Sequence, residues 1–146
     1  MSGLALLLMS VGCSDSGNLV GLVKCEGTVT YNGSPLADAM LTFHPDGGGS
    51  DARAAGASAD SSGKFEVTTL KSEDAIGPGN YKVKIVKFEE YGELPSKVAN
   101  DDGEMVQPAR PQKNTLPKKY ENPNSSGLTA TIEKGNKATL TFVLVD

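Results

Sequence analysis

The sequence predicts an all-β sandwich of six or seven short strands. Apolar and polar residues alternate with a period of two in much of the chain after Glu26, as expected for strands with one face in a core and one in water. Clusters rich in Gly, Asn, Ser and Pro separate the alternating stretches and favour turns. No stretch has the periodicity of an amphipathic helix, so we expect an all-β class.

Six stretches carry the alternation, namely residues 27–31, 39–44, 64–69, 81–85, 128–132 and 138–144. A further stretch, residues 52–59, is small and polar, and we expect it to form an edge strand. The turn clusters occupy residues 32–35, 60–63, 77–80 and 134–136. Since the chain has four Tyr, four Phe and no Trp, we expect a core built mainly from Val, Leu, Ile and Ala.

Composition excludes several functional classes. The chain has 146 residues and a net charge of −4, with scattered basic residues, so it lacks the basic patch of a nucleic-acid-binding protein. Two cysteines cannot build a disulfide scaffold, and a single histidine cannot build a multi-histidine metal site. No apolar run reaches the roughly 18 residues of a membrane span. We expect one domain, no metal and no cofactor.

The first thirteen residues have the layout of an export signal. An apolar run, residues 4–9, is followed by small residues and Cys13, after which the chain turns polar. Residues 10–13 (Ser-Val-Gly-Cys) resemble the lipobox of bacterial lipoprotein signals, although that family prefers an aliphatic residue at Ser10. The resemblance implies that residues 1–13 are a lipoprotein-type signal segment, in which Cys13 is lipidated and cleavage before it leaves Cys13 as the first residue. It also implies a polar tether over residues 14–23 and anchoring to the cell envelope. Without lipidation, a Cys13–Cys25 disulfide is the alternative in an oxidising compartment.

The body of the chain resembles a carboxypeptidase-regulatory-like, or transthyretin-like, domain. The motifs that carry this resemblance are residues 27–39 (GTVTYNGSPLADA), Phe43-His44-Pro45, residues 60–65 (DSSGKF) and residues 77–83 (GPGNYKV). The match covers residues 24–145, and we place the domain at residues 24–146. The resemblance implies a seven-stranded Greek-key sandwich, with a long loop before the last two strands, that usually serves as a non-catalytic module.

Catalysis has little support in the sequence. His44 is the only imidazole and lies on the polar face of an expected strand, where a histidine is usually a surface residue. The transthyretin-like family includes a hydrolase that depends on several histidines and a C-terminal Tyr-Arg-Gly-Ser motif, and this chain has neither. We therefore expect a protein that is not an enzyme, with a hydrolase as a distant third choice.

The stretch from Phe88 to Pro117 is predicted to be a long loop that carries function, because such length without periodicity is uncommon in a compact domain. Residues 88–107 have six acidic residues and one lysine, whereas residues 108–121 have four basic residues and one acid. Phe88, Tyr91 and Tyr120 lie in or beside the loop and are candidate binding residues. Alternatively, the two halves pair with each other and the aromatic rings cover the edge of the core.

Together these observations predict a non-enzymatic cell-envelope lipoprotein. Its sandwich would be a structural, adhesive or accessory binding module at a membrane surface, with the membrane as one partner and an envelope protein or glycan as another. The alternative is a carbohydrate- or peptide-binding domain of a larger envelope complex. No nucleic-acid partner is expected.

Overall fold

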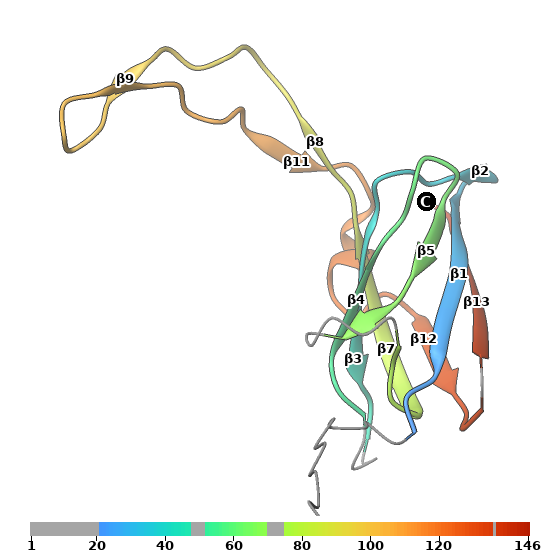
Figure 1. The fold of residues 1–146 in the computed structure, drawn as a ribbon. Helices are drawn as coiled ribbons and strands as arrows, with labels where there is room; N and C mark the ends of the chain where they lie inside the picture. The colour runs from blue at the N-terminus through green and yellow to red at the C-terminus, as the bar shows by residue number, and fades with distance from the viewer. Residues whose placement is uncertain (1–20, 48–51, 70–74, 136) are drawn as a thin grey trace, which may run out of the picture.

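The computed structural model describes residues 21–47, 52–69, 75–135 and 137–146. These residues form two β-sheets packed face to face and a long arm that projects from one end of them (Figure 1). The predicted signal, including Cys13, and residues 14–20 of the predicted tether lie outside the described residues. The described parts contain no helix long and apolar enough to cross a membrane.

The first sheet is built around the first strand of the fold. It contains β1 (Lys24–Tyr31), β2 (Ser34–Pro35), β5 (Lys64–Glu66) and β13 (Lys137–Leu144). The last strand, β13, pairs with β1 in parallel, from Lys24 opposite Lys137 to Tyr31 opposite Leu144. On its other side, β1 pairs with β2 and β5, both antiparallel. The sheet thus places the first and the last strand of the domain side by side.

The second sheet is antiparallel. In spatial order it contains β12 (Leu128–Ile132), β7 (Gly79–Val86), β3 (Met40–Pro45), β4 (Ala55–Ser58) and β6 (Thr68–Thr69). The stretch predicted as one strand over residues 64–69 is two short strands, because it pairs first with β1 and then with β4. This segment therefore links the two sheets.

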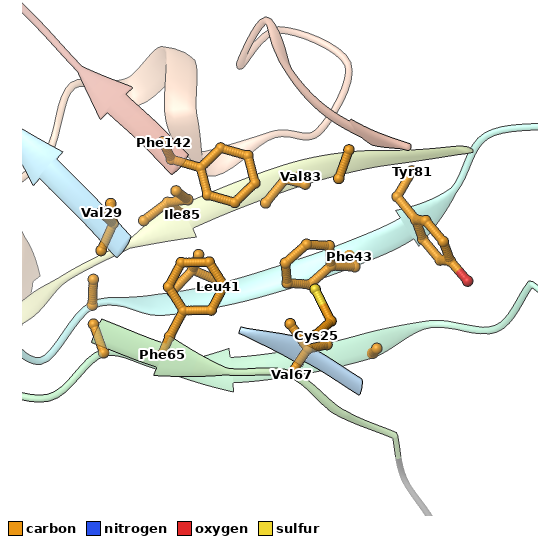
Figure 2. Packing of buried hydrophobic residues seen from close by; sticks show 14 of the residues in the cluster. Cys25, Val29, Leu41, Phe43, Phe65, Val67, Tyr81, Val83, Ile85 and Phe142 are labelled. Atoms are coloured by element: carbon orange, nitrogen blue, oxygen red, sulfur yellow. The ribbon is translucent and has the colours of Figure 1, made fainter. Parts of the chain in front are cut away.

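The alternation predicted from sequence is the alternation of burial in the structure. In β3 and β7, for example, Leu41, Phe43, Val83 and Ile85 point into the core while their neighbours face outwards. Four aromatic rings meet at the centre (Figure 2). The ring centroid of Phe43 in the second sheet lies 6.3 Å from that of Tyr81 in the same sheet, and 6.4 and 6.2 Å from those of Phe65 and Phe142 in the first sheet. The aromatic residues therefore contribute more to the core than the composition indicated.

The predicted long loop is in fact a two-stranded ribbon at its base and near its tip. It contains β8 (Phe88–Glu90), β9 (Val98–Ala99), β10 (Met105–Val106) and β11 (Gln112–Asn114). In the ribbon β8 pairs with β11, and β9 pairs with β10. We call residues 88–114 the arm. After the arm, a single turn of 3-10 helix, η1 (Lys118–Glu121), leads to β12.

Candidate functional site

The arm is held together by backbone pairing at its base and near its tip. Nearest the sandwich, the Thr115 amide donates a hydrogen bond to the Lys87 carbonyl oxygen at 2.9 Å, and further out the Tyr91 amide donates to the Pro111 carbonyl oxygen at 3.0 Å. At the tip, the Asn100 side-chain oxygen accepts hydrogen bonds from the amides of Asp102 and Glu104 at 3.1 and 2.8 Å. The arm is therefore a defined ribbon closed by an Asx turn.

Asn114 fixes the root of the arm to the sandwich. Its side-chain oxygen accepts hydrogen bonds from the amides of Lys87 and Leu116 at 3.0 and 3.2 Å, and its amide nitrogen donates to the Glu121 carboxylate at 2.8 Å. Leu116, just beyond, is buried in the core. Sequence reasoning missed Asn114, since an isolated Asn in a polar segment gives no signal of this role.

The arm carries an unusual density of exposed apolar side chains. Six of the exposed large hydrophobic residues in the described parts of the chain belong to it: Phe88, Tyr91, Leu94, Val98, Met105 and Val106. No second layer from the described residues covers them, because the arm extends away from both sheets (Figure 1). Exposed apolar clusters of this kind mark interaction surfaces in soluble proteins.

Two of the three predicted binding residues lie on this surface. The side chains of Phe88 and Tyr91 are 49% and 55% exposed, at the half of the arm nearest the sandwich. Tyr120 is different, since it lies on η1 and is 4% exposed. Its hydroxyl donates to the Val145 carbonyl oxygen at 2.9 Å and accepts from the Val145 amide at 3.0 Å. Tyr120 thus anchors the C-terminal strand and does not join Phe88 and Tyr91.

We expect Tyr120→Phe to lower the free energy of unfolding by about 1–3 kcal/mol, because it leaves the Val145 amide and carbonyl without their partner. Urea denaturation of the wild type and the variant measures this loss. Tyr91→Phe is the matched control and should change stability by less than about 0.5 kcal/mol, since the Tyr91 side chain is exposed. Equal effects of the two substitutions would contradict the anchoring role of Tyr120.

Charge is segregated along the arm. The outgoing strand has Glu89, Glu90 and Glu93, whereas the returning strand has Arg110 and Lys113. Glu89 and Lys113 face each other in the register of β8 and β11. The ion pair that Glu89 forms within 4.0 Å is with Lys87 at 3.1 Å, on its own strand. The acidic and basic halves of the arm therefore pair through their backbones, and not through an ion pair between Glu89 and Lys113.

A second candidate site is a groove of about 920 Å³ where the segment of β5 and β6 passes between the sheets. Charged groups on its walls include Glu26, Asp60, Lys64 and Glu66. The Glu26 carboxylate is paired with Lys137 at 2.6 Å. Asp60 accepts hydrogen bonds from the Ser62 hydroxyl and from the amides of Ser62 and Lys64, which lower the pKa of its carboxyl group. Both acids therefore already have partners within the fold. Sequence reasoning missed the groove because distant segments line it.

The remaining candidates for chemistry do not converge. His44 lies on β3 opposite Lys82, and its Nε2 atom is buried without a hydrogen-bond partner among the described residues. In the same parts of the chain, no group of three or more His, Cys, Asp or Glu side chains is arranged to hold a metal ion. Cys25 has no disulfide partner among the described residues, and its side chain is buried in the hydrophobic core that also contains Phe43 (Figure 2).

Burial, with a smaller contribution from Glu26, raises the pKa of the Cys25 thiol from 9.0 to about 11. The unfolded chain therefore releases this proton at lower pH than the folded chain. We expect the free energy of unfolding to fall as the pH rises from 9 towards 11. Urea denaturation across this range, in a Cys13→Ala background, should show a steeper fall for the wild-type Cys25 than for Cys25→Ala. Parallel curves for the two proteins would refute this expectation.

Comparison with known proteins identifies no family. No protein-family model matches the sequence, and no curated protein is significantly similar to it. Among solved structures, a 9R-lipoxygenase from Cyanothece PCC8801 aligns with 99% of this chain and 18% of its own, at 12% sequence identity and a TM-score of 0.39. The chain thus spans less than a fifth of that enzyme. A similarity this low assigns neither a fold family nor an activity.

Proposed function

We propose that this chain is a non-enzymatic lipoprotein of the bacterial cell envelope whose sandwich displays the arm as an accessory binding module. The observation that carries the proposal is the arm, which presents six large apolar side chains to solvent on a ribbon fixed at its root. A rigid scaffold that carries an exposed, functional connecting segment is a common plan for binding proteins. The alternative, a carbohydrate- or peptide-binding domain of a larger envelope complex, is favoured by the exposed Tyr91 ring, which suits stacking on a sugar or anchoring a peptide.

The positions of the chain entry and the arm support this arrangement. β1 begins at one end of the sandwich, and the arm leaves from the other end (Figure 1). A lipid on Cys13 would therefore hold the end of the sandwich opposite the root of the arm. Stable membrane attachment generally needs more than one acyl chain, which is what the lipobox resemblance implies.

The sheet arrangement supports the finer assignment to a transthyretin-like Greek-key sandwich. Apart from the two-residue strands β2 and β6, the two sheets contain seven strands, three in the first and four in the second. In the second sheet, antiparallel strands distant in sequence lie side by side, such as β3 with β7. Such neighbours, reached by long connections, are typical of Greek-key folds.

Retention of the purified protein on envelope fragments of its native host tests the binding role. We expect Phe88→Ala and Tyr91→Ala each to weaken retention about tenfold, the size of a typical hot-spot loss, while the melting temperature stays nearly constant. Val143→Ala, an exposed apolar residue on the sandwich, is the control and should leave retention unchanged. Unchanged retention in both arm variants would contradict the proposal.

The intact mass of the protein purified from membranes of its native host tests the anchor. A mass that begins at Cys13 and includes acyl chains, and that is lost in Cys13→Ala, supports it. An unmodified mass that begins at Met1 would remove the lipoprotein from the proposal and leave the binding role of the arm to be tested alone.

A further inference from the structure

We infer that the arm binds the arm of a second copy of this chain, with the acidic strand of each ribbon packed over the basic strand of the other. This inference deepens the proposed function, because it rests on the arm as the contact element and names one partner for it. It is carried by two features of the arm, its missing cover and its segregated charge, and by the two-fold symmetry that a closed dimer requires.

The arm lacks the support that a two-stranded ribbon needs. An isolated β-hairpin is marginally stable at best in water, and stability comes from a third strand or from a layer packed on one face. The described residues supply neither beyond β8 and β11, and the apolar side chains of Leu94, Val98 and Met105 are each about half exposed or more. A second layer from outside this chain would supply the missing cover.

The charge of the arm is complementary to itself. In the register of β8 and β11, Glu89 and Lys113 are directly opposed and share one face of the ribbon, whereas Glu90 is opposed to Gln112 and lies on the other face. The returning strand has no acidic residue from 105 to 114. A partner that fits this surface must therefore offer a basic stripe beside an acidic one. A second copy of the arm offers both a basic and an acidic stripe.

Symmetry then selects one way of pairing. If two arms join edge to edge about a two-fold axis, the same strand meets itself, so acid faces acid or base faces base, which is unfavourable. If two arms stack face to face about an axis along their length, the acidic strand of each lies over the basic strand of the other. This second arrangement forms a closed dimer and places opposite charges together.

Side chains near the root fit such a face. In an antiparallel ribbon, directly opposed residues lie on the same face, and alternate residues along a strand share it. Glu89 is opposed to Lys113, and Tyr91 is two residues beyond Glu89 and bonded through its backbone to Pro111. One face therefore carries an acid, a base and an exposed aromatic ring, which together offer charge pairing and apolar burial.

The test is sedimentation equilibrium of the full chain in a Cys13→Ala background, which prevents lipidation and disulfide exchange at that residue. We expect a monomer–dimer equilibrium for the parent. The acid-reversed variant Glu89→Lys and the base-reversed variant Lys113→Glu should each raise the dissociation constant at least tenfold, because these two residues share the stacked face. An equimolar mixture of the two variants should associate again, since a face with lysine at both positions 89 and 113 then meets a face with glutamate at both.

Glu133→Lys and Lys134→Glu are the controls, because they make the same changes of charge on an exposed turn of the sandwich. They should leave the dissociation constant unchanged. A parent that stays monomeric at all concentrations, an open-ended series of larger assemblies, or reversed variants that fail to associate when mixed would each overturn the inference.

The sedimentation and retention experiments distinguish failure of the self-pairing from failure of the proposed binding function. A monomeric parent whose retention on envelope fragments still depends on Phe88 and Tyr91 would overturn the self-pairing and leave the binding module intact. A charge-dependent dimer with no retention on the envelope would support the self-pairing and overturn the accessory binding role.

Discussion

We expect Phe43→Ala to lower the free energy of unfolding by about 3–5 kcal/mol, as is typical when a large buried aromatic side chain is removed. Phe43 is fully buried and lies between the sheets, with ring centroids 6.4 Å from Phe65, 6.3 Å from Tyr81 and 6.2 Å from Phe142. Because residues from both sheets surround it, the cavity that it leaves cannot be closed by moving one strand.

Urea denaturation followed by circular dichroism measures this loss. Met40→Ala, on the same strand but exposed to solvent, is the matched control and should change stability by less than about 0.5 kcal/mol. A loss below about 1.5 kcal/mol for Phe43→Ala would mean that the two sheets do not meet at this ring.

We expect Gly27→Ala to lower the free energy of unfolding by about 1–3 kcal/mol or more, because the added methyl group overpacks the core. This is the second largest loss that we expect, after that of Phe43→Ala. A β-carbon at Gly27 would clash with the Leu140 carbonyl oxygen and would lie 2.6 Å from Cζ of Phe65. The first of these atoms belongs to the backbone of β13, so relief requires that the parallel pairing of β1 and β13 shift.

Gly56→Ala provides the contrast, since its β-carbon would come no closer than 3.7 Å, to the Leu41 carbonyl oxygen. That substitution should be neutral or slightly stabilising, because alanine restricts the unfolded chain. Thermal denaturation of both variants distinguishes the sites. Equal stability of Gly27→Ala and Gly56→Ala would contradict the close approach of β1, β5 and β13.

The strands could be predicted because burial of one sheet face leaves a direct mark on the sequence. Residues 128–132 alternate in polarity, and β12 has those bounds. The same alternation over residues 64–69 did not reveal that the chain changes sheets after Glu66, because polarity records which face is buried and carries no information about the neighbouring strand. Strand order depends on contacts that lie far apart in sequence.

The arm could be predicted as a special segment but not as a ribbon. Its strands are two or three residues long, too short for alternation to show, and they are held by backbone bonds that any residue except proline can donate. Tyr120 has the same sequence character as Tyr91, an aromatic residue near charged ones. It is buried because its hydroxyl reaches Val145, a contact across 25 residues that the local sequence does not encode.

Excision of the arm tests most directly the central claim that the sandwich is a scaffold and the arm its contact element. Glu89 and Lys113 face each other, so residues 90–112 can be replaced by Asn-Gly, the two-residue hairpin turn of highest preference. Asn114, which fixes the root, is kept. We predict a melting temperature within a few degrees of the wild type and complete loss of retention on envelope fragments. An unfolded product, or a folded product that is retained as well as the wild type, would contradict the claim.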